Sequence, residues 1–551
     1  MTGTAAIFHH PDTIESSTTP LAGRRTAGQS FLRGYARHVH AESIDCVAGR
    51  KDHIEQFRGL MEDAGWTGSI TGHLMSNPQT LSEPGTMMLP GPNLATYAWT
   101  RRRVGQAQYA LCGITHTVST RRIMEGLTDM IFSPIEPWDA VICTSSAVRS
   151  VVQTQLDEVE AYITARFTAR RVPRPQLPII PLGIDTEQFA HVPEHRARWR
   201  KELGLASEDI AIMSMGRLSV TEKMHPTPLL LAAQKAAEDS GKRMVLLMVG
   251  WFGDEPTEKL HRNMAREFAP DVEVKFPDGK DDDLRYQIWS AADIFAFPVD
   301  NIQETYGLAP VEAMAAGLPV VCSDWNGFKD TVEDGKTGMR VRTLMASPGA
   351  GGRIAARFET GQDTYHQYLV QAHQRTVVDV PEMAAALTAL ARDPDLRARM
   401  GAAGRARARQ IYDWSAVVPQ YQALWRDMTA RRLREIPTSA PRPGGPWNPN
   451  SIDPFRLYAQ YPTSTLSPTA RLSADRVVTA EDFVHLMTLT GAATFKRMVS
   501  PAEDMAVIHH GIRTLGPISY GDLSDRTQAT QDTLEAAVLW MAKFDLIRIE
   551  T

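Results

Sequence analysis

An alternation of short apolar runs with longer amphipathic stretches, from about Thr4 to Val341, constrains the fold of this chain most strongly. The pattern is typical of parallel α/β architecture, in which a helix connects each strand to the next. Several of the runs are apolar on both faces, as expected where helices cover both sides of a sheet. The strands expected in the first half are Ala5–His9, Ile44–Ala48, Thr86–Leu89, Tyr109–Thr117, Ala140–Thr144 and Leu177–Leu182.

A short proline-rich connection leads into Gly183, and the alternation then begins again. Two consecutive α/β units of similar size predict two Rossmann-like domains that face a cleft, over residues 1–183 and 184–434. Ligands of such sheets bind outside the carboxyl ends of the strands, so we expect the functional residues there. The strands expected in the second half are Ile210–Met215, Met244–Val249, Val272–Phe276, Ile294–Pro298 and Pro319–Ser323.

The rest of the chain follows a different pattern. Residues 345–362 are rich in Gly, Pro, Ala and Ser and are expected to form a surface loop. Residues 435–472 are expected to form a proline-rich linker that builds no core. Residues 473–551 regain apolar periodicity and predict a small α+β module that resembles a winged helix. The helices expected to close the second domain are Pro381–Arg392, Asp395–Ile411 and Trp414–Arg432.

Charge and cysteine usage exclude several classes of protein. The net charge is -5, so the whole chain is not an electrostatic partner for nucleic acid. Residues 473–551 carry seven Lys or Arg against eleven Asp or Glu, which favours a protein-interaction or dimerisation module over DNA binding. Four scattered cysteines without a CxxC pair predict neither a disulfide framework nor a zinc site. Without a long apolar run or a signal-peptide pattern, we expect a cytoplasmic location.

The segment from Glu304 to Val320 carries the strongest functional signal. Gly307 suits a tight turn, and the following residues predict a short helix with Glu312 in its first turn. The free N–H groups of Gly307 and Leu308 at the start of that helix suit a phosphate. Glu304 and Glu312 flank this anion site, and carboxylates bind sugar hydroxyls in pairs.

A pair of cations forms the second signal. Arg217 follows a buried run and a glycine, and Lys223 lies six residues further on. An arginine offers a bidentate fork and a lysine a compact charge, a combination suited to a diphosphate.

The stretch from Ala291 to Gly338, together with the Gly-Arg-Leu element at 216–218, closely resembles the donor site of glycosyltransferase family 4. These are retaining nucleotide-sugar transferases of the GT-B fold. The resemblance implies that Arg217 and Lys223 hold the donor diphosphate, while Glu312 binds the ribose and Glu304 the sugar. Many members place the lysine five residues after the arginine, whereas here the spacing is six.

Three further residues take roles from their family position. His116 ends an apolar run and would lie beside the donor sugar. Gly28 lies in a segment that is a glycine-rich loop in the family, near the leaving phosphate and the acceptor, although Ala27 stands here beside it instead of a second glycine. Gly279 would form part of the nucleobase pocket.

A run of arginines at 101–103, after Trp99, is a candidate for peripheral contact with anionic lipid. A charged helix end is the favoured interpretation of this run.

Together the motifs predict metal-independent transfer of a hexose from a UDP- or GDP-sugar to a glycan, a lipid-linked glycan or a small molecule, with retention of configuration. Arg217, Lys223 and the helix amides would stabilise the departing diphosphate in place of a metal, and no other cofactor is expected. No DxD-type metal loop stands at a matching place.

Three alternatives were weighed. A phosphorylase or epimerase of the same fold does not need this glutamate pair beside Gly-Arg-Leu. A glycosidase has no use for the two cations of a diphosphate site. A transferase-like scaffold that acts through its C-terminal module is disfavoured because Glu304, Glu312 and Arg217 are intact.

Overall fold

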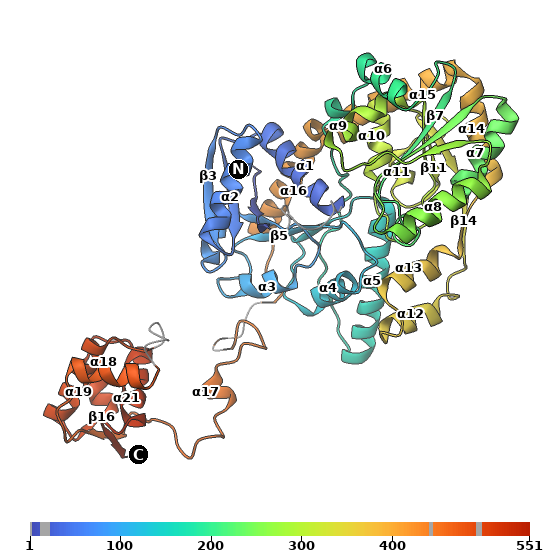
Figure 1. Cartoon of the computed structure of the whole chain (residues 1–551). Coiled ribbons are helices and arrows are strands. Elements are labelled where there is room, and N and C mark those ends of the chain that lie inside the picture. The colour runs from blue at the N-terminus through green and yellow to red at the C-terminus, as the bar shows by residue number, and fades with distance from the viewer. Residues whose placement is uncertain (1–2, 12–22, 440–442, 444, 492–498, 551) are drawn as a thin grey trace. The chain divides into compact units, whose positions relative to one another are not determined.

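The computed structural model describes residues 3–11, 23–439, 443, 445–491 and 499–550. The chain divides into two compact units, Met1–Asn448 and Pro449–Thr551, which are described separately (Figure 1). The first unit contains two lobes, each built on a six-stranded sheet in which every pair is parallel. Both sheets have the same doubly wound strand order, 3-2-1-4-5-6 when each lobe is numbered from its own first strand.

The first lobe has the strand order β3-β2-β1-β4-β5-β6. Its apolar runs form β-strands because helices cover both faces of the sheet and bury the side chains on each. The strands are β1 (Ala6–Phe8), β2 (Ser43–Ala48), β3 (Ser69–Leu74), β4 (Thr86–Met88), β5 (Ala110–Ile114) and β6 (Ala140–Ile142). The helices are α1 (Gly23–His38), α2 (Lys51–Asp63), α3 (Ala95–Arg102), α4 (Arg121–Phe132) and α5 (Ser146–Phe167).

Two expectations for this lobe need correction. Edge strand β3 was not predicted, because its sequence contains Gly72 and His73 in place of a continuous apolar run. The run Leu177–Leu182 is not a regular strand. It makes isolated parallel bridges beside β6, since Pro178 and Pro181 have no N–H to donate to a ladder.

The second lobe has the strand order β12-β11-β10-β7-β8-β9. Every residue of β8 is buried, as its apolar sequence predicts. The strands are β7 (Ile210–Met215), β8 (Met244–Val249), β9 (Glu273–Lys275), β10 (Ile294–Phe297), β11 (Val320–Ser323) and β12 (Gly338–Val341). The helices are α6 (Pro193–Glu202), α7 (Thr227–Ser240), α8 (Glu255–Phe268), α9 (Asp282–Gln287), α10 (Leu308–Ala316), α11 (Phe328–Thr331), α14 (Val380–Arg392) and α15 (Pro394–Arg407).

Helix α16 (Trp414–Arg434) packs on the first lobe, although its sequence range was grouped with the second. Figure 1 shows it beside α1 and β5. Its apolar face buries Tyr421 and Trp425 against the rings of Phe31 and Tyr35 in α1. The position of this helix is therefore set by the apolar face of the first lobe that it covers. A local sequence pattern does not show that tertiary contact.

An inserted helical hairpin occupies part of the segment expected to be a loop. It consists of α12 (Gly352–Glu359) and α13 (Tyr365–His373), between the paired strands β13 (Thr343–Met345) and β14 (Thr376–Val378). The ring of Phe358 in α12 stacks on Tyr368 in α13, with centroids 4.4 Å apart. The loop prediction is wrong for α12 because good helix formers follow the glycine-rich turn and one aromatic anchors them.

The second unit has its own core around Phe483, Met505, Ile512 and Val538. Its three-stranded antiparallel sheet has the order β16-β15-β17. The module contains helices and a small sheet, as the expected α+β composition requires. The winged-helix relationship stays a prediction. The elements are β15 (Arg471–Ser473), α18 (Ala480–Leu489), α19 (Ala502–Leu515), β16 (Ile518–Ser519), α20 (Tyr520–Arg526), α21 (Gln531–Lys543) and β17 (Arg548–Glu550). One short helix, α17 (Pro454–Leu457), lies in the expected linker.

All four cysteines are buried and free. Within the part of the chain that the structure describes, no helix combines the length and the apolar character needed to cross a membrane.

Candidate active site

The loop that follows β10 carries Glu304 and is fixed by side-chain amides. Asn301 is fully buried, and its Nδ2 donates to the carbonyl of Thr221 over 2.8 Å. The Asn326 Nδ2 donates to the carbonyl of Glu304 over 3.1 Å. These bonds hold the loop rigidly at the carboxyl end of the second sheet, where α/β folds bind ligands.

Glu304 is paired with Lys223. The Lys223 Nζ lies 2.5 Å from Glu304 Oε2, and the glutamate side chain is only 12% exposed. Burial alone would raise the pKa of Glu304, but the Lys223 ammonium and the N–H groups of Thr305 and Tyr306 outweigh it and lower the pKa below its usual value. Glu304 is therefore held ionised. Glu304, which was predicted to bind the sugar, and Lys223, which was predicted to bind the diphosphate, lie in direct contact.

Arg217 is also held by a carboxylate. Its guanidinium forms an ion pair with Glu222, whose other oxygen contacts the Nε2 of His366 in α13. Burial lowers the pKa of Arg217, although a guanidinium stays charged at any pH relevant here. The inserted hairpin thus contacts the loop that carries Arg217 and Lys223 through one carboxylate, that of Glu222.

Three glycines pack together where neighbouring strands end. Gly216 follows β7, Gly250 follows β8 and Gly279 comes after β9. A Cβ on Gly250 would lie 1.9 Å from the carbonyl oxygen of Gly216, and the Gly279 N–H donates to the carbonyl of Gly250 over 2.9 Å. No side chain fits between these backbones. Gly279 thus lies close to Gly216, the residue before Arg217, through Gly250; its role in a nucleobase pocket stays a prediction.

Gly307 and Leu308 open α10 without a side-chain cap. Gly307 has a φ of 82°, and a Cβ there would lie 2.1 Å from the Phe328 ring, so only glycine fits. The N-terminus of this helix therefore carries unsatisfied partial positive charge that suits an anion.

Glu312 lies in the second turn of α10, not in its first as expected, because the helix begins at Leu308 ahead of Pro310. Burial raises the pKa of Glu312 to about 7, while the charges of Arg285 and Lys223 act in the opposite direction. Lys223 thus influences both predicted carboxylates.

Glu312 lines a polar cavity with residues from both lobes. Leu308, Arg285 and Tyr286 belong to the second lobe, and Arg33 on α1 belongs to the first. A carboxylate with a ring and cations around it matches the chemistry of a nucleoside, whose ribose hydroxyls and base need hydrogen bonds and stacking.

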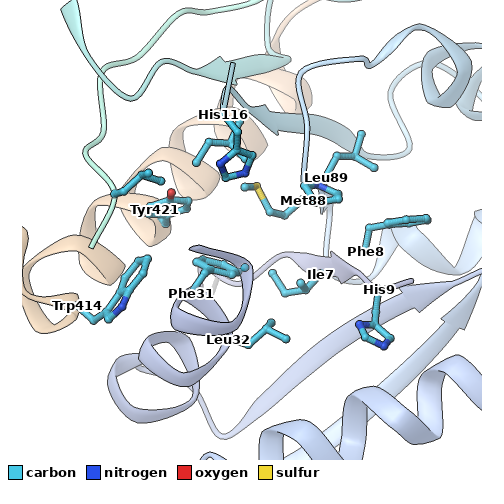
Figure 2. A pocket seen from close by; sticks show the side chains of 14 residues that line it. Ile7, Phe8, His9, Phe31, Leu32, Met88, Leu89, His116, Trp414 and Tyr421 are labelled. Carbon is cyan, nitrogen blue, oxygen red and sulfur yellow. The ribbon is translucent and has the colours of Figure 1, made fainter. Parts of the chain in front are cut away.

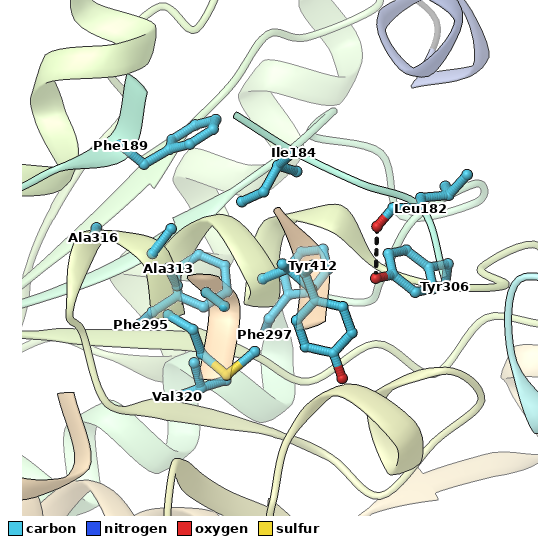
Figure 3. Close-up of a cluster of buried hydrophobic side chains, with 14 of the residues drawn as sticks. Leu182, Ile184, Phe189, Phe295, Phe297, Tyr306, Ala313, Ala316, Val320 and Tyr412 are labelled. Atoms are coloured by element: carbon cyan, nitrogen blue, oxygen red, sulfur yellow. Dashed lines mark hydrogen bonds between the residues drawn. The ribbon is translucent and has the colours of Figure 1, made fainter. Parts of the chain in front are cut away.

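His116 follows β5 and lies at the seam between the lobes. The Thr305 hydroxyl, next to Glu304, donates to the His116 carbonyl over 3.0 Å. The Ser145 hydroxyl donates to the Thr305 carbonyl over 2.9 Å. Figure 3 shows Tyr306 reaching across to the Leu182 carbonyl, with 2.9 Å between oxygens. Three hydrogen bonds, made by the consecutive residues Thr305 and Tyr306, therefore join the Glu304 loop to the first lobe.

Gly28 lies within α1 and not in a loop. Helix α1 already begins at Gly23, and Ala27, a good helix former, stands where the family usually has a second glycine beside Gly28. Gly28 and His116 line one apolar cavity (Figure 2), whereas Glu312 lines the polar one.

Several residues that hold the predicted site side chains were missed at the sequence level. Glu222 and Asn301 were not singled out, although Glu222 precedes Lys223 by one residue and Asn301 precedes Glu304 by three. Asp300 was also missed. Burial raises its pKa to about 7, and its Oδ2 lies 3.9 Å from the Nδ1 of buried His373.

The arginine run at 101–103 is a helix end, as favoured, but Arg101 is no lipid contact. Its side chain is fully buried and forms a bidentate pair with Asp139, at 2.6 and 2.8 Å. Arg102 donates to the carbonyl of Trp447 over 3.1 Å, and Arg103 lies over the Trp447 ring. All three arginines of the run therefore make contacts with other residues of the first unit.

A family model matches part of the second lobe, and matches to known proteins extend over further parts of the chain. Residues 195–344 match the family model described as glycosyl transferases group 1. A D-inositol 3-phosphate glycosyltransferase of Nocardia farcinica is 30% identical over 171 residues, which are 31% of this chain and 37% of that protein. A GDP-mannose-dependent alpha-(1-6)-phosphatidylinositol monomannoside mannosyltransferase of Mycolicibacterium smegmatis is 26% identical over 344 residues, 59% of this chain and 84% of that protein.

The chain spans less than half the length of the D-inositol 3-phosphate glycosyltransferases of Nocardia farcinica and Corynebacterium efficiens, 37% and 46% respectively. Among solved structures, Anabaena HepE in complex with UDP and glucose is similar, with a TM-score of 0.48 and 16% identity. That match covers 76% of this chain and 98% of HepE.

The sequence match and the topology agree. The matched segment contains Arg217, Lys223, Glu304 and Glu312. Two doubly wound lobes with one strand order confirm the predicted GT-B fold. Residues 195–344 of this chain are therefore similar to the group 1 glycosyltransferases, which agrees with the predicted resemblance to glycosyltransferase family 4.

Proposed function

We propose that this protein is a retaining glycosyltransferase that moves a hexose from a UDP- or GDP-hexose to a hydroxyl acceptor without a metal ion. The observation that carries the proposal is the convergence of Arg217, Lys223 and Glu304 beside the uncapped start of α10. Cations, helix amides and an ionised carboxylate on one sheet edge match a sugar diphosphate group by group.

The donor would be held in three parts. Its diphosphate would lie between Arg217, Lys223 and the N–H groups of Gly307 and Leu308. Its ribose would bind Glu312 in the polar cavity, and its hexose would bind Glu304 near the lobe seam. Gly279 would leave room for the nucleobase beside the glycine cluster.

The reaction would run on one face of the sugar. The bond from the anomeric carbon to the diphosphate breaks, and the acceptor oxygen bonds to the same face of that carbon. A leaving-phosphate oxygen accepts the proton of the acceptor hydroxyl. Arg217, Lys223 and the α10 amides stabilise the charge that grows on the diphosphate. His116 would contact the sugar from the first lobe.

The experiment is a panel of nucleotide sugars, with release of nucleotide measured for the full chain with and without EDTA. We expect one UDP- or GDP-hexose to be hydrolysed well above the others, with activity unchanged by EDTA. The anomer of the transferred sugar, assigned by NMR, is expected to match the donor. Arg217→Ala should lower turnover more than nucleotide affinity.

Two results would sink the proposal. One is the absence of hydrolysis of any nucleotide sugar by a folded protein that also binds no nucleotide. The other is an inverted product. Loss of activity in EDTA that magnesium restores would overturn the metal-free part alone.

A further inference from the structure

An apolar cavity lies at the carboxyl ends of the first-lobe strands, beneath His116 (Figure 2). It encloses about 670 Å³ of space when its open mouth is counted. Strands β1, β4 and β5, helix α1 and helix α16 all contribute to its walls. The lining residues are Ile7, Phe8, His9, Gly28, Phe31, Leu32, Met88, Leu89, Pro90, Ile114, His116, Leu182, Trp414 and Tyr421.

The described walls are largely apolar. Among the described lining residues there is no Lys, Arg, Asp or Glu. The Trp414 Nε1 already donates to the Ser30 hydroxyl over 2.9 Å, and the His9 Nε2 lies 3.1 Å from the Gln56 amide oxygen. A charged ligand group would lose its hydration in this cavity and find no Lys, Arg, Asp or Glu among the described lining residues, which is strongly unfavourable.

Four aromatic rings stand among the aliphatic lining residues. Phe8, Phe31, Trp414 and Tyr421 come from three different elements, and Figure 2 shows Phe31, Trp414 and Tyr421 around one side of the space. Aromatic walls favour flat, apolar ligands through stacked and edge-to-face contacts. The polar cavity around Glu312 offers the opposite chemistry, with Arg33, Arg37 and Arg285 in its lining.

The cavity meets the candidate donor site at two residues, His116 and Leu182. His116 lines it, and the His116 carbonyl accepts the Thr305 hydroxyl beside Glu304. Leu182 also lines it and accepts the Tyr306 hydroxyl from the same loop. A ligand filling the cavity would therefore present its outer end to the place where Glu304 would hold the donor sugar.

We infer that this cavity binds the acceptor, and that the acceptor is a compact, neutral aromatic compound that carries a hydroxyl group. The inference rests on the proposed function and names its acceptor class. Phe8, Phe31, Trp414 and Tyr421 offer ring faces and edges against which such a compound can pack. The absence of charge among the described lining residues disfavours a phosphorylated polyol.

The test uses the full chain and the donor selected by the hydrolysis panel, with 2-naphthalenemethanol and inositol 1-phosphate as competing acceptors. We expect the aryl glycoside to form with a kcat/KM at least tenfold above that for the phosphorylated polyol. Filling the cavity with Met88→Trp should raise the KM for the aryl alcohol at least tenfold. The matched variant Met345→Trp, on exposed β13, should leave it unchanged.

The affinity of Met88→Trp for the nucleotide shows whether the variant folds. If it does not fold, binding of the aryl alcohol to the wild-type chain tests the proposal directly. Binding of 2-naphthalenemethanol to the wild-type chain should be saturable and should quench Trp fluorescence, with Trp414→Phe reducing the quench. Preferred transfer to inositol 1-phosphate, or no saturable aryl binding while donor hydrolysis persists, would overturn the acceptor assignment alone. Absence of donor hydrolysis and of nucleotide binding would instead overturn the proposed function.

Discussion

The ammonium of Lys223 lies 2.5 Å from the carboxylate of Glu304, across 81 residues of sequence. Lys223 also lies over the ring of Phe297, 5.4 Å from its centroid, and its side chain passes Gly216. One cation thus ties the end of β7 to the loop after β10. The extra residue between Arg217 and Lys223, relative to many family members, does not prevent this contact.

Removing the cation should shift the pH profile of the enzyme. In Lys223→Met, Glu304 keeps its burial but loses the charge that lowers its pKa, so we expect that pKa to rise above its usual value. Donor binding and turnover that need ionised Glu304 would then fail at a higher pH. The acid limb of kcat/KM for donor hydrolysis should move upward, and stability should fall by about 1–2 kcal/mol.

The double variant Lys223→Met, Glu304→Gln provides the control for stability. Because it leaves no unpaired charge, we expect it to be more stable than Lys223→Met alone. An unchanged acid limb in Lys223→Met would contradict the role given to the pair.

The buried carboxyl of Glu312 should make stability depend on pH. Its folded pKa is raised to about 7, whereas an unfolded glutamate titrates near 4.5. Between these values the native state holds a proton that the unfolded state has lost, so stability falls as the pH rises and the penalty is complete above pH 7. Glu312→Gln should therefore be more stable than wild type at pH 8, on the order of 2 kcal/mol, and about equal at pH 4.5.

Denaturant melts at pH 4.5 and pH 8 measure this difference, with the exposed Glu62→Gln as the matched control. The same Glu312→Gln variant should bind nucleotide more weakly, because it loses the charged acceptor for the ribose hydroxyls. A variant that is no more stable at pH 8, or one that binds nucleotide normally, would count against the assignment.

The sequence predicted elements that depend on local pattern and missed those that depend on tertiary partners. All five strands expected for the second lobe are present: four are mainly apolar runs, and β9 alternates apolar with charged residues. The position of α16, in contrast, depends on its packing against α1, β4 and β5, which lie far earlier in the sequence. The same applies to the site. The sequence motifs identified Glu304 and Arg217. No spacing rule, however, shows that Glu222 forms an ion pair with Arg217 or that His366 of the inserted hairpin contacts Glu222.

Glu222 should restrain Arg217 in the absence of a donor. A diphosphate must take the guanidinium from Glu222, and the carboxylate also repels the phosphate. Glu222→Gln removes both effects, so we expect the affinity for the nucleoside diphosphate to rise roughly threefold to tenfold, as measured by calorimetry. The matched control is Glu202→Gln, which removes an exposed pair with Arg198 at 2.9 Å.

A weaker affinity in Glu222→Gln would show that the carboxylate positions Arg217 for the phosphate instead of competing with it. The double variant Glu222→Gln, Arg217→Ala separates the two cases. It should bind no better than Arg217→Ala if the gain acts through the arginine.

The boundary of the glycosyltransferase unit should lie near Asn448 and not at Arg434. Thr438, Ser439 and Trp447 contact the first lobe. There, fully buried Glu136 accepts hydrogen bonds from the Thr438 N–H and hydroxyl and from the Ser439 hydroxyl, at 2.9, 2.7 and 2.9 Å. Truncation after Arg434 removes all three bonds, so we expect a loss of about 1–3 kcal/mol and a lower Tm. The full-length double variant Thr438→Val, Ser439→Ala should reproduce most of that loss.

Truncation after Asn448 removes only the second unit, and we expect its Tm and its nucleotide-sugar hydrolysis to match those of the full chain. The second unit has its own core and carries exposed apolar side chains, including Leu489 at 69% and Val507 at 72% exposure. Together with its net negative charge, this favours contact with protein over DNA. Light scattering should therefore give a dimer for the full chain and a monomer for the chain ending at Asn448. Equal masses for the two, with salt-sensitive binding of the full chain to duplex DNA, would overturn the dimerisation role while leaving the boundary at Asn448 intact.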